Sequence, residues 1–177
     1  MASKLRVDQI EPVDGVPTGG AGGIIQCVQT VRTSTYSNEL ATLTDTGEVI
    51  QATITPKFTS SKIMIWAHCC LGLANDGNVS IKFVRGGSDI TGATGDASSN
   101  RTRVTATGHT DATARDFNIS AMYLDSPSTT SATTYGIKLR HGENGTTWIY
   151  MNRNHSNGDS GLTLAPVSSL TVMEMSA

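Results

Sequence analysis

Hydrophobic and polar residues alternate with a period of two through most of the chain, a pattern typical of half-buried β-strands. In Val49–Thr55, for example, Ile50, Ala52 and Ile54 share one face, and mostly polar residues share the other. Ser37–Leu43 predicts one short helical turn at most. Eight segments have a strand pattern: Ile24–Thr33, Val49–Thr55, Lys62–Ala74, Val79–Arg85, Phe117–Asp125, Thr133–His141, Thr146–Asn152 and Ser168–Ser176.

Many short strands separated by Gly, Asn and Pro favour an all-β fold, and we expect an antiparallel β-sandwich of the jelly-roll type. Two polar segments predict tight hairpin turns between strands that are consecutive in sequence. The first is Asn75-Asp76-Gly77-Asn78, in which Asp-Gly is a strong hairpin signal, and the second is Glu143-Asn144-Gly145.

Two strands carry apolar residues on both faces, whereas an ordinary sandwich strand has one wet face. In Lys62–Ala74, Ile63, Ile65, Ala67, Cys69 and Leu71 lie on one face and Met64, Trp66 and Cys70 on the other. In the last strand, Leu170 and Val172 oppose Met173 and Met175. The second face therefore predicts a contact surface for the N-terminal arm or a neighbouring subunit, and the residues expected at a subunit interface are Met64, Trp66, Met173 and Met175.

The first 23 residues have a different character from the rest of the chain. Residues 1–18 form an extended arm stiffened by Pro12 and Pro17, residues 19–23 a glycine hinge, and residues 24–177 the β-sandwich head. We expect the arm to order when it docks on another protein, and the alternative is a disordered tail. The expected docking residues are Leu5, Val7, Ile10 and Val13.

Two polar segments, Gly86–Arg115 and Asn152–Gly161, are predicted loops, and loops of this kind often carry binding sites. The second segment follows Trp148 and Tyr150, and amides, arginine and aromatic faces can recognise sugar hydroxyls and rings, although the loop residues are also ordinary turn formers. The candidate receptor-binding residues are Asp96, Asn100, Arg101, Arg103, His109, Asn154 and His155.

Composition and charge narrow the classes of partner that the protein is expected to bind. The 177 residues carry a net charge of −2 and no basic run, so no nucleic-acid binding is expected. No apolar run is long enough for a membrane span, and no signal peptide is visible, so we expect folding in a cytoplasm and no membrane insertion. Cys27, Cys69 and Cys70 are interpreted as buried free thiols.

No constellation of residues predicts catalysis. The histidines lack zinc-site spacing, and there is no Gly-x-Ser-x-Gly motif, so we expect neither an enzyme nor a metal or other cofactor. The alternative is a glycan depolymerase with a carboxylate pair. Its candidate residues are Asp96, Asp111, Asp116 and Asp125.

Several segments resemble fibre and fibre-like structural proteins of tailed bacteriophages, especially marine and cyanobacterial ones. At the N-terminus the resemblance rests on Ser3–Pro17 with the glycine hinge and Ile24-Ile25-Gln26. In the body it rests on Gly95-Asp96, Asn100–Val104, Tyr123–Tyr135 and Leu170–Met175, and the stretch from Asp-Ser-Pro to Thr-Thr-Tyr within Tyr123–Tyr135 is its most specific part. It implies a virion component, assembled in the host cytoplasm and commonly a homotrimer. The arm would attach to other virion proteins, and the head would face host surface polysaccharide. A capsid decoration protein, head fibre or tail connector without receptor binding remains the alternative.

Overall fold

The computed structural model describes residues 23–110, 116–142, 144–159 and 164–176. The predicted arm, its docking residues Leu5, Val7, Ile10 and Val13, and the hinge up to position 22 lie outside the described residues. Asp111 also lies outside them.

The described residues form an all-β fold, as the alternating pattern predicts. In chain order the elements are β1 (Ile24–Arg32), β2 (Tyr36–Leu40), β3 (Asp45–Ile54), β4 (Lys62–Leu73), β5 (Gly77–Arg85), β6 (Ser88–Asp89), the 3-10 turn η1 (Thr91–Ala93), β7 (Ala106–Thr110), β8 (Asp116–Asp125), β9 (Thr133–His141), β10 (Thr147–Met151) and β11 (Ser168–Met175).

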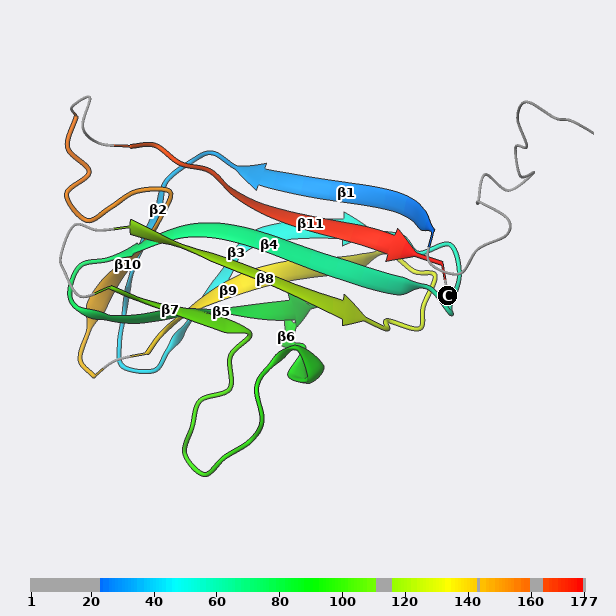
Figure 1. The fold of residues 1–177 in the computed structure, drawn as a ribbon, viewed down its shortest axis with the longest axis horizontal. Helices are drawn as coiled ribbons and strands as arrows, with labels where there is room; N and C mark the ends of the chain where they lie inside the picture. Colours follow the sequence, from blue (N-terminus) through cyan, green and yellow to red (C-terminus); the bar gives the residue numbers. More distant parts are fainter. Residues whose placement is uncertain (1–22, 111–115, 143, 160–163, 177) are drawn as a thin grey trace, which may run out of the picture.

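The strands form two antiparallel sheets that pack as a sandwich (Figure 1). In sheet A, β4 pairs along one edge with β8 and along the other with β11 and then β10, while β1 extends the sheet beyond β11 and β2 beyond β10. In sheet B, β5 pairs with β9 on one edge and with β7 and β6 on the other, and β3 lies beyond β9. The antiparallel β-sandwich is therefore confirmed.

The core lies between the sheets and is built from the inward faces of their central strands. Ile63, Ile65 and Ala67 of β4 are fully buried, as are Phe83 of β5 and Ile137 of β9. Burial of each large apolar side chain stabilises the fold by about 1.5–3 kcal/mol. The alternating residues Val79, Ile81 and Phe83 of β5 are fully buried, as expected for the inward face of a half-buried strand.

Both predicted hairpins are wrong, because the strands on either side of each predicted turn belong to different sheets. The turn after β4 leads from sheet A to β5 in sheet B, and the connection after β9 leads from sheet B to β10 in sheet A. The residues of a turn predict that the chain reverses direction, but they do not determine in which sheet the next strand pairs. Strands with long apolar inner faces, such as β4 and β5, bury those faces against each other across the sandwich.

Two polar segments contain strands that the pattern did not predict. Tyr36–Leu40 is the edge strand β2 rather than a helical turn, and it pairs with Thr147–Met151 of β10. The predicted loop Gly86–Arg115 holds β6, η1 and β7. Each of these short strands lies at a sheet edge and buries few side chains, so it depends on pairing with its neighbour and leaves little apolar pattern in the sequence.

Candidate functional site

The outer face of sheet A brings together all four residues predicted at a subunit interface. Met64 and Trp66 lie on β4, and Met173 and Met175 lie on β11 beside it, with Met64 opposite Met173. The register extends this apolar row across four neighbouring strands, in the order Leu124 (β8), Met64 (β4), Met173 (β11) and Cys27 (β1).

Several apolar side chains on this face are exposed in the single chain, and Met64, Met173 and Met175 are half-buried. Trp66 is 50% exposed and Met122, its neighbour on β8, is 65% exposed. Contiguous exposed apolar surface marks a contact site, whereas scattered exposed side chains do not. We call this surface the sheet A patch, formed by Ile24, Cys27, Met64, Trp66, Met122, Leu124, Met173 and Met175.

Polar groups that bond to one another border the patch. On one side, Gln29 Nε2 donates to Thr171 Oγ1 at 2.8 Å, and His68 Nδ1 lies 3.2 Å from Ser120 Oγ. On another, Lys62 Nζ donates to the hydroxyl of Ser126 at 2.8 Å. An apolar centre with a polar rim is the anatomy of a protein–protein interface.

The N-terminal segment joins the head at the border of the same patch. The backbone N–H of Ser176 donates to the carbonyl of Gly23 at 2.9 Å, and the N–H of Gly23 donates to Ser176 Oγ at 3.1 Å. The chain therefore enters β1 beside the end of β11, next to Ile24 and Met175 of the patch.

The three cysteines do not share one environment. Cys69 and Cys70 are buried as predicted, but Cys27 is exposed on the sheet A patch, which corrects the interpretation of all three as buried thiols. Burial raises the pKa of Cys69 to about 12. Burial and the neighbouring Asp116 raise the pKa of Cys70 to about 11.

Four of the candidate receptor residues lie in the long loop between η1 and β7. Asp96, Asn100 and Arg101 are exposed, and the last two line a hollow of about 640 Å³. Arg103 is half-buried, and its guanidinium donates to the carbonyls of Gly95 at 2.5 Å and Thr91 at 3.1 Å. Arg103 therefore holds the loop in shape.

The remaining candidate receptor residues lie elsewhere and also make intramolecular contacts. His109 is on β7, with Nε2 3.2 Å from the carboxylate of Asp76. His155 Nδ1 lies 2.7 Å from the hydroxyl of Tyr150, while Asn154 Oδ1 accepts from the N–H of Asn157 at 2.9 Å. The loop after β10 and the loop before β7 extend from different parts of the sandwich (Figure 1), so the structure does not join the two sets into one site.

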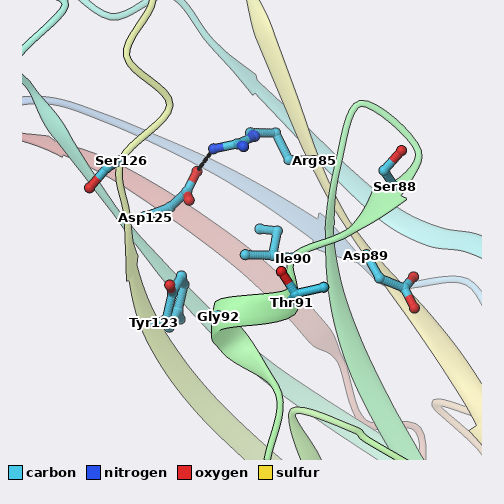
Figure 2. A pocket seen from close by; sticks show the side chains of 9 residues that line it. All are labelled: Arg85, Ser88, Asp89, Ile90, Thr91, Gly92, Tyr123, Asp125 and Ser126. Carbon is cyan, nitrogen blue, oxygen red and sulfur yellow. Dashed lines mark hydrogen bonds and ion pairs between the residues drawn. The ribbon is translucent and has the colours of Figure 1, made fainter.

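A polar cavity of about 340 Å³, which the sequence did not predict, lies at one end of the sandwich (Figure 2). It lies where the end of β8 faces the end of β5, β6 and η1. On one wall, Arg85 Nη1 donates to Asp125 Oδ2 at 2.6 Å, and the hydroxyl of the buried Tyr135 donates to the same oxygen at 2.8 Å. We call it the Arg85 pocket, lined by Arg85, Ser88, Asp89, Ile90, Thr91, Gly92, Tyr123, Asp125 and Ser126.

Within the Arg85–Asp125–Tyr135 network, the pKa values of Tyr135 and Arg85 are both raised. Burial raises the pKa of Tyr135, and the hydrogen bond to the Asp125 carboxylate raises it further, so the phenol stays neutral. Burial alone would lower the pKa of Arg85, but the hydrogen bond and charge of Asp125 outweigh it and raise that pKa. The guanidinium therefore stays charged.

Sequence alone offered only a weak signal for this pocket. Asp125 and Tyr135 are the two ends of the Asp-Ser-Pro to Thr-Thr-Tyr stretch, and their hydrogen bond closes that loop. Arg85 is 40 residues earlier, and no local pattern places it against Asp125.

The sequence matches no protein-family model, and a search of curated proteins finds none that matches it. Within the described residues, no three His, Cys, Asp or Glu side chains are grouped to hold a metal ion. The same part of the chain contains no helix with the length and apolar character needed to cross a membrane.

Proposed function

We propose that the chain is a structural protein of a bacteriophage virion. In this proposal it is a fibre-type adhesin that forms a homotrimer through the sheet A patch. It attaches to the particle through its N-terminal arm and presents its head to host surface glycans. The sheet A patch is the observation that carries the proposal, because an enzyme or carrier acting as a single chain has no use for an exposed apolar sheet face. The virion assignment and the number three rest on the sequence resemblance.

The patch is continuous across four strands. Strands are spaced about 4.8 Å apart and rise about 3.3 Å per residue, and the patch covers three or four residues on each strand, so it measures roughly 20 by 12 Å. Continuous apolar surface of a few hundred Å² often marks an interaction site.

The side chains on the patch suit a threefold axis. A sheet face turned toward such an axis meets both neighbours at once, and the contact closes into a ring. Met64, Met173 and Met175 are flexible and can fill the irregular space between three twisted faces, while Trp66 supplies a large anchor.

A second candidate is a capsid decoration protein, head fibre or tail connector without receptor affinity. Arg103, Asn154 and His155 favour it, because the structure uses these predicted receptor residues for intramolecular contacts. The two candidates differ at the cell surface: a purified adhesin binds intact host cells, whereas a purified decoration protein binds only particles that lack it.

The assembly is tested by the mass of the full chain in solution, measured by light scattering. We expect a trimer for the unmodified protein and a monomer for Trp66→Lys, because a charge at the centre of a buried apolar contact is costly. Trp148→Lys is the matched control: Trp148 is 42% exposed on β10 and pairs with Glu39, away from the patch, so this variant stays trimeric. A monomeric unmodified chain, or a trimeric Trp66→Lys variant, contradicts the proposal.

A further inference from the structure

The Arg85 pocket contains several hydrogen-bonding groups that the assembly role does not use. Its walls come from two sheets, with Tyr123 and Asp125 on β8 and Arg85 on β5, and η1 closes one side (Figure 2). Gly92 allows this closure, because a Cβ at that position would collide with the hydroxyl of Tyr123. Ile90 is nearly buried and gives the pocket an apolar element.

The polar groups of the pocket are held in place by hydrogen bonds but keep further donor and acceptor capacity for a ligand. Asp125 is only 5% exposed, and within the described residues its two side-chain hydrogen bonds both end on Oδ2. A carboxylate has further acceptor capacity on its second oxygen, and a guanidinium has five N–H donors. Arg85 uses one N–H on Asp125, and its side chain is 40% exposed. Hydroxyls of Ser88, Thr91, Tyr123 and Ser126 add donors and acceptors.

Cations balance the two carboxylates of the pocket. Asp125 forms an ion pair with Arg85. Asp89 forms two: its Oδ2 lies 2.6 Å from Lys82 Nζ, and its Oδ1 lies 3.7 Å from Lys138 Nζ. An anionic ligand would lie close to two carboxylates, and a cationic ligand would lie close to the fixed guanidinium of Arg85. An apolar ligand would leave the polar walls unpaired at a large cost. A neutral ligand rich in hydroxyl groups satisfies the walls without adding charge.

A second hollow of about 360 Å³ adjoins the first, and Arg85 lines both. Its walls are less polar and include Pro127, Ala132 and Thr133. Each hollow has the volume of a small-molecule site, which is about 300–1,000 Å³. Two sites that share one arginine suit a ligand made of two linked units, each with hydroxyl edges and an apolar face.

From these observations we propose that the Arg85 pocket and the adjoining hollow bind a neutral oligosaccharide. Arg85 and Asp125 form hydrogen bonds with the hydroxyls of the sugar unit in the Arg85 pocket. Identifying the ligand as a host surface glycan rests on the proposed adhesin function. The ligand class itself follows from the pocket of a single chain.

The test uses the full-length protein and saturation-transfer NMR. The probes are two neutral disaccharides, maltose and lactose, and the methyl glycosides of glucose, galactose and mannose. Glucuronic acid and glucosamine are the charged comparators. A printed array of neutral bacterial oligosaccharides extends the set. We expect a neutral oligosaccharide to give saturation transfer, to bind more tightly than its single units, and to bind more tightly than either charged sugar.

Thr91→Trp fills the pocket from its rim without replacing a member of the Arg85–Asp125–Tyr135 network. We expect this variant to weaken binding of the neutral oligosaccharide at least tenfold. Thr102→Trp makes the same substitution in the same long loop but at the separate hollow beside Arg101, so it leaves binding unchanged. Circular dichroism verifies that both variants fold.

The proposal is overturned if no neutral probe binds, if a charged sugar binds better, or if binding persists in Thr91→Trp. These outcomes are independent of the assembly test. A trimer that binds no neutral sugar removes the pocket proposal and leaves the assembly role, whereas a monomer that binds one does the reverse.

Discussion

Glu174 shows how one residue can join three segments of the sandwich. It points inward from β11 and is fully buried, although its neighbours Leu170 and Val172 on that face are apolar. Its carboxylate accepts from Gln26 Nε2 at 2.6 Å, Ser61 Oγ at 2.6 Å and the backbone N–H of Lys57 at 2.7 Å. Burial would raise the pKa of Glu174, but these hydrogen bonds prevail and lower it below the ordinary value of 4.5.

This lowered pKa predicts a loss of stability in acid. Because the folded-state pKa lies below the unfolded value, the carboxylate stabilises the fold fully above about pH 4.5, and the contribution disappears as the pH falls through the folded pKa. Glu174→Gln places an amide NH₂ against N–H and O–H donors, so we expect a loss of about 2 kcal/mol at pH 7. Urea unfolding between pH 3 and pH 7 measures both effects.

The matched control is Glu39→Gln, because Glu39 is an exposed carboxylate on β2. The control should unfold at the same urea concentration as the unmodified protein at pH 7. If Glu174→Gln keeps the full acid dependence of the unmodified protein, the role assigned to the Glu174 carboxylate is wrong.

At the scale of elements, strands with a strong apolar alternation were predictable, including the edge strands β1, β3 and β8, whereas the short polar edge strands were not. Lys62–Ala74 is observed as Lys62–Leu73, and Thr133–His141 is observed with the predicted bounds. The polar edge strands β2 and β7 escaped prediction because they bury few side chains of their own. Their existence depends on the pairing that β10 and β5 supply.

Gly108 lies on β7 where this strand of sheet B packs closely against β8 of sheet A. A Cβ at this position would collide with the ring of Phe117 and lie 3.3 Å from Ile119, both on β8 in the other sheet. Overpacking of this kind typically costs about 1–3 kcal/mol, and we expect Gly108→Ala to lower the free energy of unfolding by that amount. Thermal or urea denaturation measures the change.

Gly95→Ala provides the comparison, since a Cβ at Gly95 would meet nothing within 4 Å among the described atoms. This variant should change stability by less than about 0.5 kcal/mol. Replacing the ring in the double variant Gly108→Ala, Phe117→Leu should recover part of the loss. Equal stability of the two alanine variants would show that β7 and β8 separate easily.

At the scale of the whole molecule, the two candidate sites differ in how far sequence could predict them. The sheet A patch was predictable in part. Because side chains alternate along a strand, Met64 and Trp66 must share one face of their strand, and Met173 and Met175 must share one face of theirs. The register that joins these faces needed the structure. The Arg85 pocket was not predictable, since it forms only where the ends of β5 and β8, in different sheets, meet.

Cys27 reports on the assembly of the whole molecule. It is exposed in the apolar row beside Met173, whereas Cys69 and Cys70 are buried and their pKa values are raised to about 12 and about 11. The thiolate is the reactive form, so at pH 8 a disulfide reagent should modify Cys27 far faster than the other two. If three sheet A patches meet, the trimer should protect Cys27 at least tenfold relative to the monomeric Trp66→Lys variant.

Cys27→Ser identifies the reactive thiol, because the fast phase should vanish in that variant while the slow reaction of the buried pair remains. Trp148→Lys keeps the patch intact and should show the same protection as the unmodified trimer. Equal rates at Cys27 in the trimer and in monomeric Trp66→Lys would mean that the chains associate through another surface. Because this measurement follows one atom on the patch, it separates an assembly built on sheet A from a trimer formed elsewhere on the molecule, which mass alone cannot do.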